Sequence, residues 1–185
     1  LGTPIPIRPL KAVGLPMDGS DSSNEWRGYR ELEETPHAYN PDRGWLATCN
    51  NKSERSQYPI PGNYAIDRII RISQLLESHS ALTVVDMKLF QMDDTNVYLL
   101  HWKKPLVTAF SALGNDPLAS AIVSWDGSCS LHSLEAPLML SFIFRLKEAI
   151  FADEVGEFAR RISLAWLDQV YRDTTSSWFD NIVTD

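Results

Sequence analysis

The chain has 185 residues, 44% of them apolar and 22% charged, proportions that fit a globular protein with a core and exclude a disordered or fibrous chain. A net charge of −7 argues against a nucleic-acid partner, because phosphate binding requires a clustered positive surface. No apolar run reaches the ~18 residues of a membrane span. Leu1 is not an initiator Met, and Leu1–Leu10 lacks a signal-peptide layout. We therefore expect a processed or excised piece of a longer protein.

The first third of the chain is rich in residues that break helices. Eight of the 11 prolines and six of the nine glycines lie in residues 1–62, which predicts loops and short strands. The best strand candidates are Ile5–Arg8, at most an edge strand because prolines flank it, and Trp45–Cys49.

From Asn63 the apolar spacing is helical. Isoleucines and leucines recur every three or four residues up to Leu76, as in an amphipathic helix. Thr83 followed by Asp86 predicts an N-cap. It opens a helical run, continuous or broken, to Leu113, which Pro105 should kink or end.

The last third predicts three more helices. Asp116-Pro117 resembles an N-cap acid followed by a first-position proline, with an end near the turn Trp125-Asp126-Gly127. Ser133 should start a helix over Leu134–Phe151, which we expect to be buried on all sides because 138–144 is apolar on almost every side. A final helix is predicted over Phe158–Arg172. The fold class is thus mainly α, with a strand-containing segment 1–62 followed by a helical segment 63–185.

Most single candidates for chemistry favour structural explanations. The four histidines show no metal-site spacing, and two cysteines leave the redox compartment open. Cys49 has no catalytic signature around it and is more simply a small residue near a strand end. Asp93-Asp94 is a paired-carboxylate candidate but fits a helix cap better. No glycine-rich phosphate loop is present.

A combination of motifs is more informative. An Asn pair, Asn50-Asn51, ends a predicted strand, and a side-chain amide held there is a good donor to a developing oxyanion. Arg68 opens the next helix, where the helix dipole favours anions, so an anionic group or a cluster of structural carbonyls should lie nearby.

These motifs resemble the penicillin acylase (penicillin amidase) family of N-terminal-nucleophile hydrolases, and specifically the interior of its β chain. The resemblance covers nearly the whole chain and depends on the order and spacing of motifs, none of which is specific alone. The matching segments are Trp26-Arg27-Gly28, Asn40–Asn51, Tyr58-Pro59, Arg68-Ile69, Gln91-Met92-Asp93, Trp125-Asp126-Gly127, Asp153-Glu154-Val155-Gly156 and Trp178-Phe179-Asp180.

The resemblance implies cleavage of linear amides by the N-terminal Ser, Thr or Cys of a processed β chain, whose own α-amine is the base. It places Asn50 on the oxyanion-hole asparagine, and Arg68 on an arginine that orders that asparagine or the substrate. It implies an αββα sandwich, a periplasmic or secreted bacterial enzyme, and remaining α- and β-chain segments as partners.

This sequence also departs from the family. The nucleophile, the backbone oxyanion partner and the acyl-pocket strands are not found in the chain, so we expect no activity from it alone. Calcium is possible in the complete enzyme, but the loop Ile60–Asn63 offers no matching carboxylate, and no metal or other cofactor is assigned to this chain. Cys49 replaces the usual Ala and Asn96 a frequent Ser. Without the resemblance, a non-catalytic helical binding or scaffold domain remains the alternative.

Overall fold

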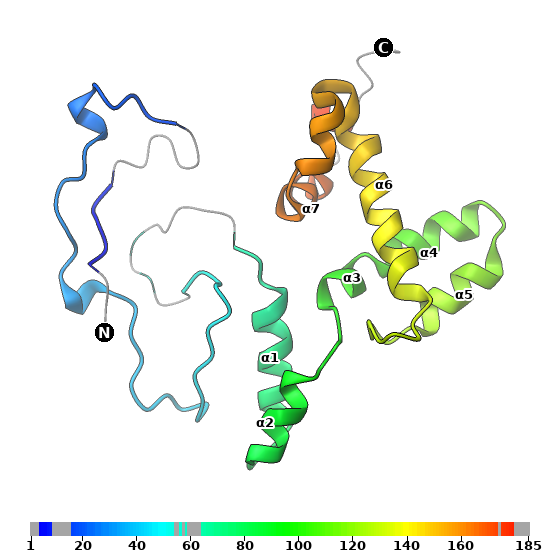
Figure 1. The fold of residues 1–185 in the computed structure, drawn as a ribbon, viewed down its shortest axis with the longest axis horizontal. Coiled ribbons are helices and arrows are strands. Elements are labelled where there is room, and N and C mark those ends of the chain that lie inside the picture. Colours follow the sequence, from blue (N-terminus) through cyan, green and yellow to red (C-terminus); the bar gives the residue numbers. More distant parts are fainter. Residues whose placement is uncertain are drawn as a thin grey trace. The chain divides into compact units, whose positions relative to one another are not determined.

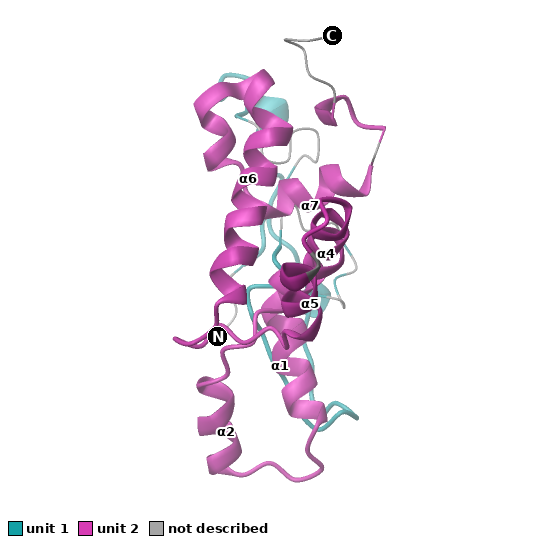
Figure 2. Ribbon diagram, turned by 90° about the vertical axis from the view of Figure 1, so that its right-hand side faces the viewer, with its two compact units in different colours: residues 1–66 teal, residues 67–185 magenta. Residues whose placement is uncertain are grey.

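The computed structural model describes residues 4–8, 16–53, 56, 58, 64–173 and 175–179. The chain separates into two compact units, Leu1–Ile66 and Asp67–Asp185 (Figure 2). The prediction of a mainly α chain is confirmed. The loop Ile60–Asn63 and the end of the chain from Asp180 lie outside the described residues.

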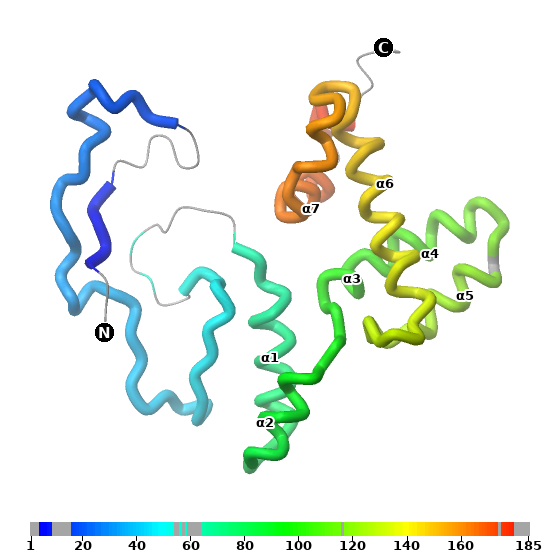
Figure 3. The backbone as a smooth tube through the Cα atoms, in the orientation of Figure 1, coloured from blue at the N-terminus to red at the C-terminus, as the bar shows by residue number. Residues whose placement is uncertain are grey.

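The first unit consists of extended and turn segments (Figure 3). Its regular elements are the 3₁₀ turns η2 (Ser22–Asn24) and η3 (Leu32–Glu34). The predicted edge strand Ile5–Arg8 forms a single antiparallel bridge, Pro6 to Tyr29. The Ile7 amide donates to the Gly28 carbonyl at 2.9 Å, which holds this bridge in register.

The predicted strand Trp45–Cys49 is wrong: among the described residues, no segment pairs with it. A local contact also occupies part of this segment. The Arg43 guanidinium lies 4.1 Å from the centre of the Trp45 ring. Its Nε also donates to the Trp45 carbonyl at 3.1 Å, so an acceptor that a sheet would need is already used.

The second unit is helical (Figure 1). Its elements are α1 (Asp67–Glu77), α2 (Val84–Gln91), α3 (Val97–His101), α4 (Lys103–Ala112), α5 (Asp116–Ser124), α6 (Glu135–Val155), η4 (Gly156–Arg161), α7 (Leu164–Arg172) and η5 (Ser177–Phe179). Its longest helix, α6, contacts α3 and α4, and it also contacts the two 3₁₀ helices that follow it in the chain, η4 and η5.

The observed start of a helix matches the predicted one best where a polar side chain forms the N-cap. Thr83 accepts from the Asp86 amide and Asp86 reaches back to the Thr83 amide, so the expected cap of α2 is confirmed. At α6 the N-cap is Leu134, one residue after the predicted Ser133, although the Ser133 hydroxyl still accepts from the Ala136 amide at 3.2 Å. At α5 the prediction is one residue late, because the N-cap is Asn115 and Asp116 is already helical.

The predicted helical run is interrupted near Pro105, as expected, but on its N-terminal side, because a proline at 105 has no N–H to donate to the His101 carbonyl. The run breaks after α2 and again at Trp102, whereas Pro105 is the third residue of α4 and the helix continues to Ala112. A proline is tolerated there because the first-turn amides have no partner within the helix.

The predicted helix Phe158–Arg172 is also wrong as a single element. Gly156, at φ 56°, ends α6, and a 3₁₀ turn follows it. Ile162 is extended, and Ser163 starts α7 by accepting from the Trp166 amide. A serine that caps a new helix is therefore what divides the segment.

The core of the second unit surrounds one face of α6. Its largest fully buried side chains are Trp102, Phe151, Leu99, Ile122, Met139, Ile143 and Leu167. Lys147 is buried among them, and its Nζ donates to the Arg160 carbonyl at 3.0 Å, which ties η4 to α6. Burial lowers the pKa of this lysine.

Helix α6 is central to the core, as its apolar sequence predicts, but it is not buried on all sides. Leu140 is 41% exposed and Phe144 is 53% exposed, although their sequence neighbours Met139 and Ile143 are fully buried. An apolar sequence indicates that a helix packs against apolar neighbours. The described residues cover only one face of α6, so apolar side chains on the rest of the helix are exposed.

Two loops of the helical unit form one structure, which we call the loop junction: residues 93–96 and 125–129. A β-bridge joins Thr95 to Ser128. The Asn96 amide donates to the Gly127 carbonyl at 2.9 Å, and the Cys129 amide donates to the Asp94 carbonyl at 3.0 Å. The motifs Gln91-Met92-Asp93 and Trp125-Asp126-Gly127, which are far apart in sequence, therefore meet in the fold.

Gly127 should be hard to replace, because its φ is +95° and a Cβ there would lie 2.8 Å from Leu100 Cγ. Gly127→Ala should destabilise the chain by about 2–4 kcal/mol, from backbone strain and overpacking together. Gly114→Ala is the control, since Gly114 has φ +69° with nothing within 4 Å of its Cβ position. Strain alone should cost it about 1–2 kcal/mol. If urea denaturation gave equal losses of unfolding free energy for the two variants, the Leu100 side chain would be shown to move aside without a cost in stability.

Candidate functional site

Asn50 lies in a tight turn of the first unit. Its φ is 60°, a left-handed conformation that Asn adopts more readily than most residues. The next side chain supports the turn, because Asn51 Oδ1 accepts from the Cys49 amide at 3.0 Å and Asn51 Nδ2 donates to the Lys52 carbonyl at 3.1 Å. The two members of the Asn pair therefore differ in role, and Asn51 holds the backbone.

The Asn50 side chain is exposed and makes no hydrogen bond with any residue that the structure describes. Its amide is therefore available to a group outside the described part of the chain. A buried Asn that satisfies neighbouring backbone groups, the structural alternative, would show the opposite features. The expectation that Asn50 ends a strand is wrong, as Trp45–Cys49 is unpaired, whereas its exposure agrees with the prediction.

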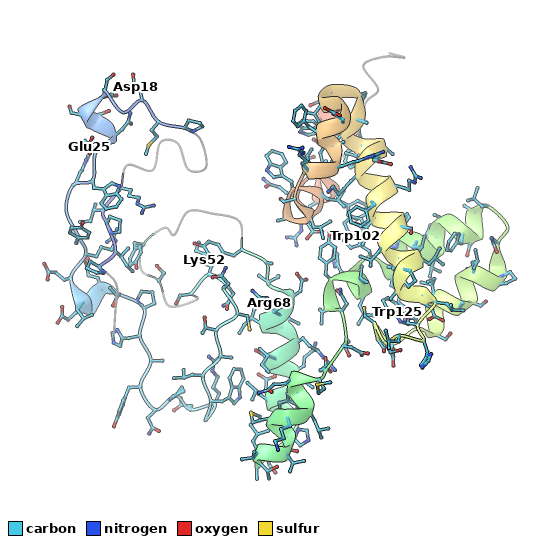
Figure 4. All side chains as sticks on the ribbon, in the orientation of Figure 1. Asp18, Glu25, Lys52, Arg68, Trp102 and Trp125 are labelled. Carbon is cyan, nitrogen blue, oxygen red and sulfur yellow. The ribbon has the colours of Figure 1, made fainter. Side chains whose placement is uncertain are left out.

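Arg68 is the second residue of α1 and is exposed (Figure 4). The first turn of α1 also contains Asp67, whose negative charge suits the N-terminal end of a helix. Asn50 belongs to the first unit and Arg68 to the second. The expected proximity of their side chains stays a prediction.

A buried polar cluster of the helical unit was missed by the sequence analysis. Tyr98 Oη, Trp102 Nε1 and Asp168 Oδ1 are buried atoms without a hydrogen-bond partner among the described residues. Burial, and then the charge of Asp168, raise the pKa of Tyr98. The charge of Asp67, in the first turn of α1, raises the pKa of Tyr98 by a smaller amount. The sequence signal was Asp168 between the apolar residues Leu167 and Val170.

The charge of Asp168 should reduce stability, because burial raises its pKa above the ordinary 3.8. A carboxyl with a raised folded-state pKa contributes stability below its unfolded pKa, and that stability is lost as the pH rises. Asp168→Asn should therefore be more stable than the parent at pH 7, by up to about 1 kcal/mol, and the gain should shrink toward pH 4. Glu157→Gln, at an exposed position, is the control for urea denaturation at both pH values. A gain that does not depend on pH would contradict the electrostatic explanation.

The remaining candidates take structural roles. Asp93 pairs with Arg71, and Asp94 Oδ2 accepts from the Ser128 hydroxyl at 3.2 Å, so the two carboxylates diverge and do not form a paired site. Cys49 is half-buried, Cys129 is exposed, and neither forms a disulfide. In the described residues, no group of three or more His, Cys, Asp or Glu is placed to hold a metal ion. No helix in the described part combines the length and hydropathy of a membrane span.

Comparison with known proteins gives a family match over residues 2–185, to the model described as penicillin amidase. The acyl-homoserine lactone acylase QuiP of Pseudomonas aeruginosa is 26% identical over 160 residues, which cover 77% of this chain and 19% of that protein. The QuiP of Pseudomonas fluorescens Pf0-1 is 27% identical over 168 residues, 77% of this chain and 20% of that protein.

The penicillin G acylase of Escherichia coli is 31% identical over 126 residues, 61% of this chain and 14% of that protein. The chain thus spans about a fifth or less of the length of the curated relatives that it matches. Because the family match covers the chain from its second residue to its last, this chain belongs to the penicillin amidase family.

Proposed function

We propose that the chain is an interior β-chain segment of an amidohydrolase that cleaves linear amides through an N-terminal Ser located outside these 185 residues. Family membership supports an amidase-like activity. The observation that carries the site is the exposed Asn50 amide, which has no hydrogen-bond partner among the described residues. In this proposal the complete sandwich is the αββα fold expected for the family.

Asn50 is proposed to donate its side-chain amide to the oxyanion of the tetrahedral intermediate. Such a donor is effective when it is held in place before charge develops, because no reorganisation is then needed during the reaction. The Asn51 contacts to Cys49 and Lys52 provide this support in the turn itself. The second oxyanion donor and the attacking hydroxyl would come from other segments of the enzyme.

Arg68 is proposed to order Asn50 or the substrate from the start of α1. A guanidinium has five donors and keeps its charge at all relevant pH values, which suits it to hold a carbonyl oxygen in a fixed place. Its position in the first turn of the helix, next to Asp67, provides a rigid base for this role.

The proposed substrate class is a molecule with an amide-linked acyl chain. Two relatives that match 77% of this chain carry the name acyl-homoserine lactone acylase, against 61% for the relative named penicillin G acylase. We therefore place N-acyl-homoserine lactones before penicillins as substrates. A quorum-quenching role would follow from that choice.

The partners in this proposal are the remaining α- and β-chain segments, in a periplasmic or secreted bacterial enzyme. They would cover the apolar side chains that this chain exposes, among which are Leu140 and Phe144 on α6 and Val84, Val85 and Leu89 on α2. Calcium, where the complete enzyme binds it, would be held mainly by those other segments.

The test is hydrolysis of an N-acyl-homoserine lactone by the complete processed enzyme, followed as release of the fatty acid and the homoserine lactone amine. Penicillin G is the second substrate. We expect turnover by the enzyme and none by the 185-residue chain alone. Turnover by the isolated chain would overturn the segment proposal. A complete enzyme that cleaves neither amide would favour the non-catalytic scaffold alternative.

A further inference from the structure

A two-bond ion pair connects α1 to the loop junction. Arg71 Nε donates to Asp93 Oδ1 at 2.8 Å, and Arg71 Nη2 donates to Asp93 Oδ2. The same Nη2 lies 3.1 Å from the Thr95 hydroxyl. The Asp93 side chain is 15% exposed and that of Arg71 is 30% exposed. Two parallel bonds from one planar guanidinium restrict orientation as well as distance, so this pair controls how α1 is held.

The Asp93 end of this pair is rigidly supported. Thr95 donates its amide to Asp93 Oδ1 at 3.2 Å, and Thr95 itself bridges to Ser128 across the loop junction. On the far side, Lys103 Nζ donates to the Trp125 carbonyl at 2.6 Å. Asp93 is therefore connected to the start of α4 and the end of α5, close to the core.

Helix α1 also packs against α3. Its one buried residue is Leu76, near its C-terminal end. Arg71 lies between Leu76 and the first turn of the helix. Since residues three apart share a helix face, Arg68 and Arg71 lie on the same side of α1. A shift of Arg71 would therefore also move the Arg68 side of the helix.

We propose that Arg71 and Asp93 are positioning residues for the amidase reaction, which act by holding α1 so that Arg68 projects toward the reacting amide. The proposal depends on the proposed function, in which Arg68 orders Asn50 or the substrate. It gives the Gln91-Met92-Asp93 and Trp125-Asp126-Gly127 motifs a single role, as the support on which α1 is fixed. Neither Arg71 nor Asp93 touches the substrate in this proposal.

The test is a double-mutant cycle in the complete processed enzyme, with Asp93→Asn and Arg68→Ala made singly and together. Asp93→Asn should lower kcat/KM about 10-fold, within the ~10²-fold that misplacement of a group by 1 Å can cause. In the Arg68→Ala background it should lower kcat/KM less than about twofold, because the group that it positions is gone. The two substitutions should therefore be non-additive in their effect on kcat/KM, as expected for residues that act as one unit. If Asp93 only stabilised the fold, Asp93→Asn should lower kcat/KM by the same factor in both backgrounds.

A second variant and a control complete the design. Arg71→Lys keeps the charge but loses the fork of donors, so it should reproduce the Asp93→Asn kinetics even if that variant folds poorly. Glu148→Gln breaks the ion pairs of α6 with Arg145 and Arg160, and it should leave kcat/KM unchanged. Effects of Asp93→Asn and Arg68→Ala that simply multiply would overturn the positioning proposal. An Arg68→Ala enzyme with normal kinetics would instead remove the role of Arg68 itself.

Discussion

Asn50→Ala in the complete processed enzyme should lower kcat by about 10²–10³-fold, equivalent to ~2.7–4 kcal/mol of lost transition-state stabilisation, as for other single oxyanion donors. KM should change much less, because the lost hydrogen bond forms mainly in the transition state. Stability should be nearly unchanged, since the Asn50 side chain is exposed and bonds to none of the described residues. Steady-state kinetics and a thermal melt of the same preparation measure both quantities.

Asn51→Ala is the matched control for this prediction. It removes the acceptor of the Cys49 amide and the donor to the Lys52 carbonyl, so it should loosen the turn and lower the melting temperature. Its effect on kcat should be smaller than that of Asn50→Ala and indirect. A full-rate Asn50→Ala enzyme would contradict the oxyanion role and leave the family membership intact. The reverse ranking of the two variants would assign the role to Asn51.

Trp102→Ala should be the most destabilising single change in the helical unit, at about 3–5 kcal/mol. Trp102 has 0% exposure, and its ring centre lies 4.7 Å from that of Tyr171. The indole also contacts Tyr98 and His101, so its loss leaves a cavity between α3 and α7. Urea denaturation followed by circular dichroism measures the loss.

Trp102→Phe separates packing from hydrogen bonding at the same position. Trp102 Nε1 has no partner among the described residues, so its removal sacrifices no hydrogen bond to them, and Phe should recover much of the stability lost in Trp102→Ala. Trp166→Ala, at a side chain that is 43% exposed, is the control and should have a smaller effect. Equal losses for Ala and Phe at position 102 would show that the indole N–H has a partner after all.

Sequence reasoning predicted the fold best where local physics decides. The Thr83–Asp86 capping box and the end of α5 before Trp125 involve side chains and backbone within one turn, and both are as expected. It failed where a distant or missing partner decides. The Trp45–Cys49 segment has strand-like residues but no described strand beside it. The exposed face of α6 at Leu140 and Phe144 has the same origin.

For the candidate site, the sequence identified residue types and order but not contacts. Asn50 could be proposed from its place in a motif. That Asn51, and not Asn50, holds the backbone of the turn can be seen only from the hydrogen bonds of Asn51. The Arg71–Asp93 pair joins residues 22 apart, and no local pattern marks them as partners. The same is true of Tyr98 and Asp168, which come together only when α3 and α7 pack.

The loop junction has a consequence for the order of folding. Its Ser128–Asp94 hydrogen bond closes a loop across a separation of 34 residues, whereas α4 and α5 are consecutive helices that pack against each other. Contacts between sequence neighbours form before contacts that must close a long loop, because loop closure costs entropy before it yields any interaction. We therefore expect the hairpin of α4 and α5 to form early, and the junction, with its 34-residue separation, to close after it.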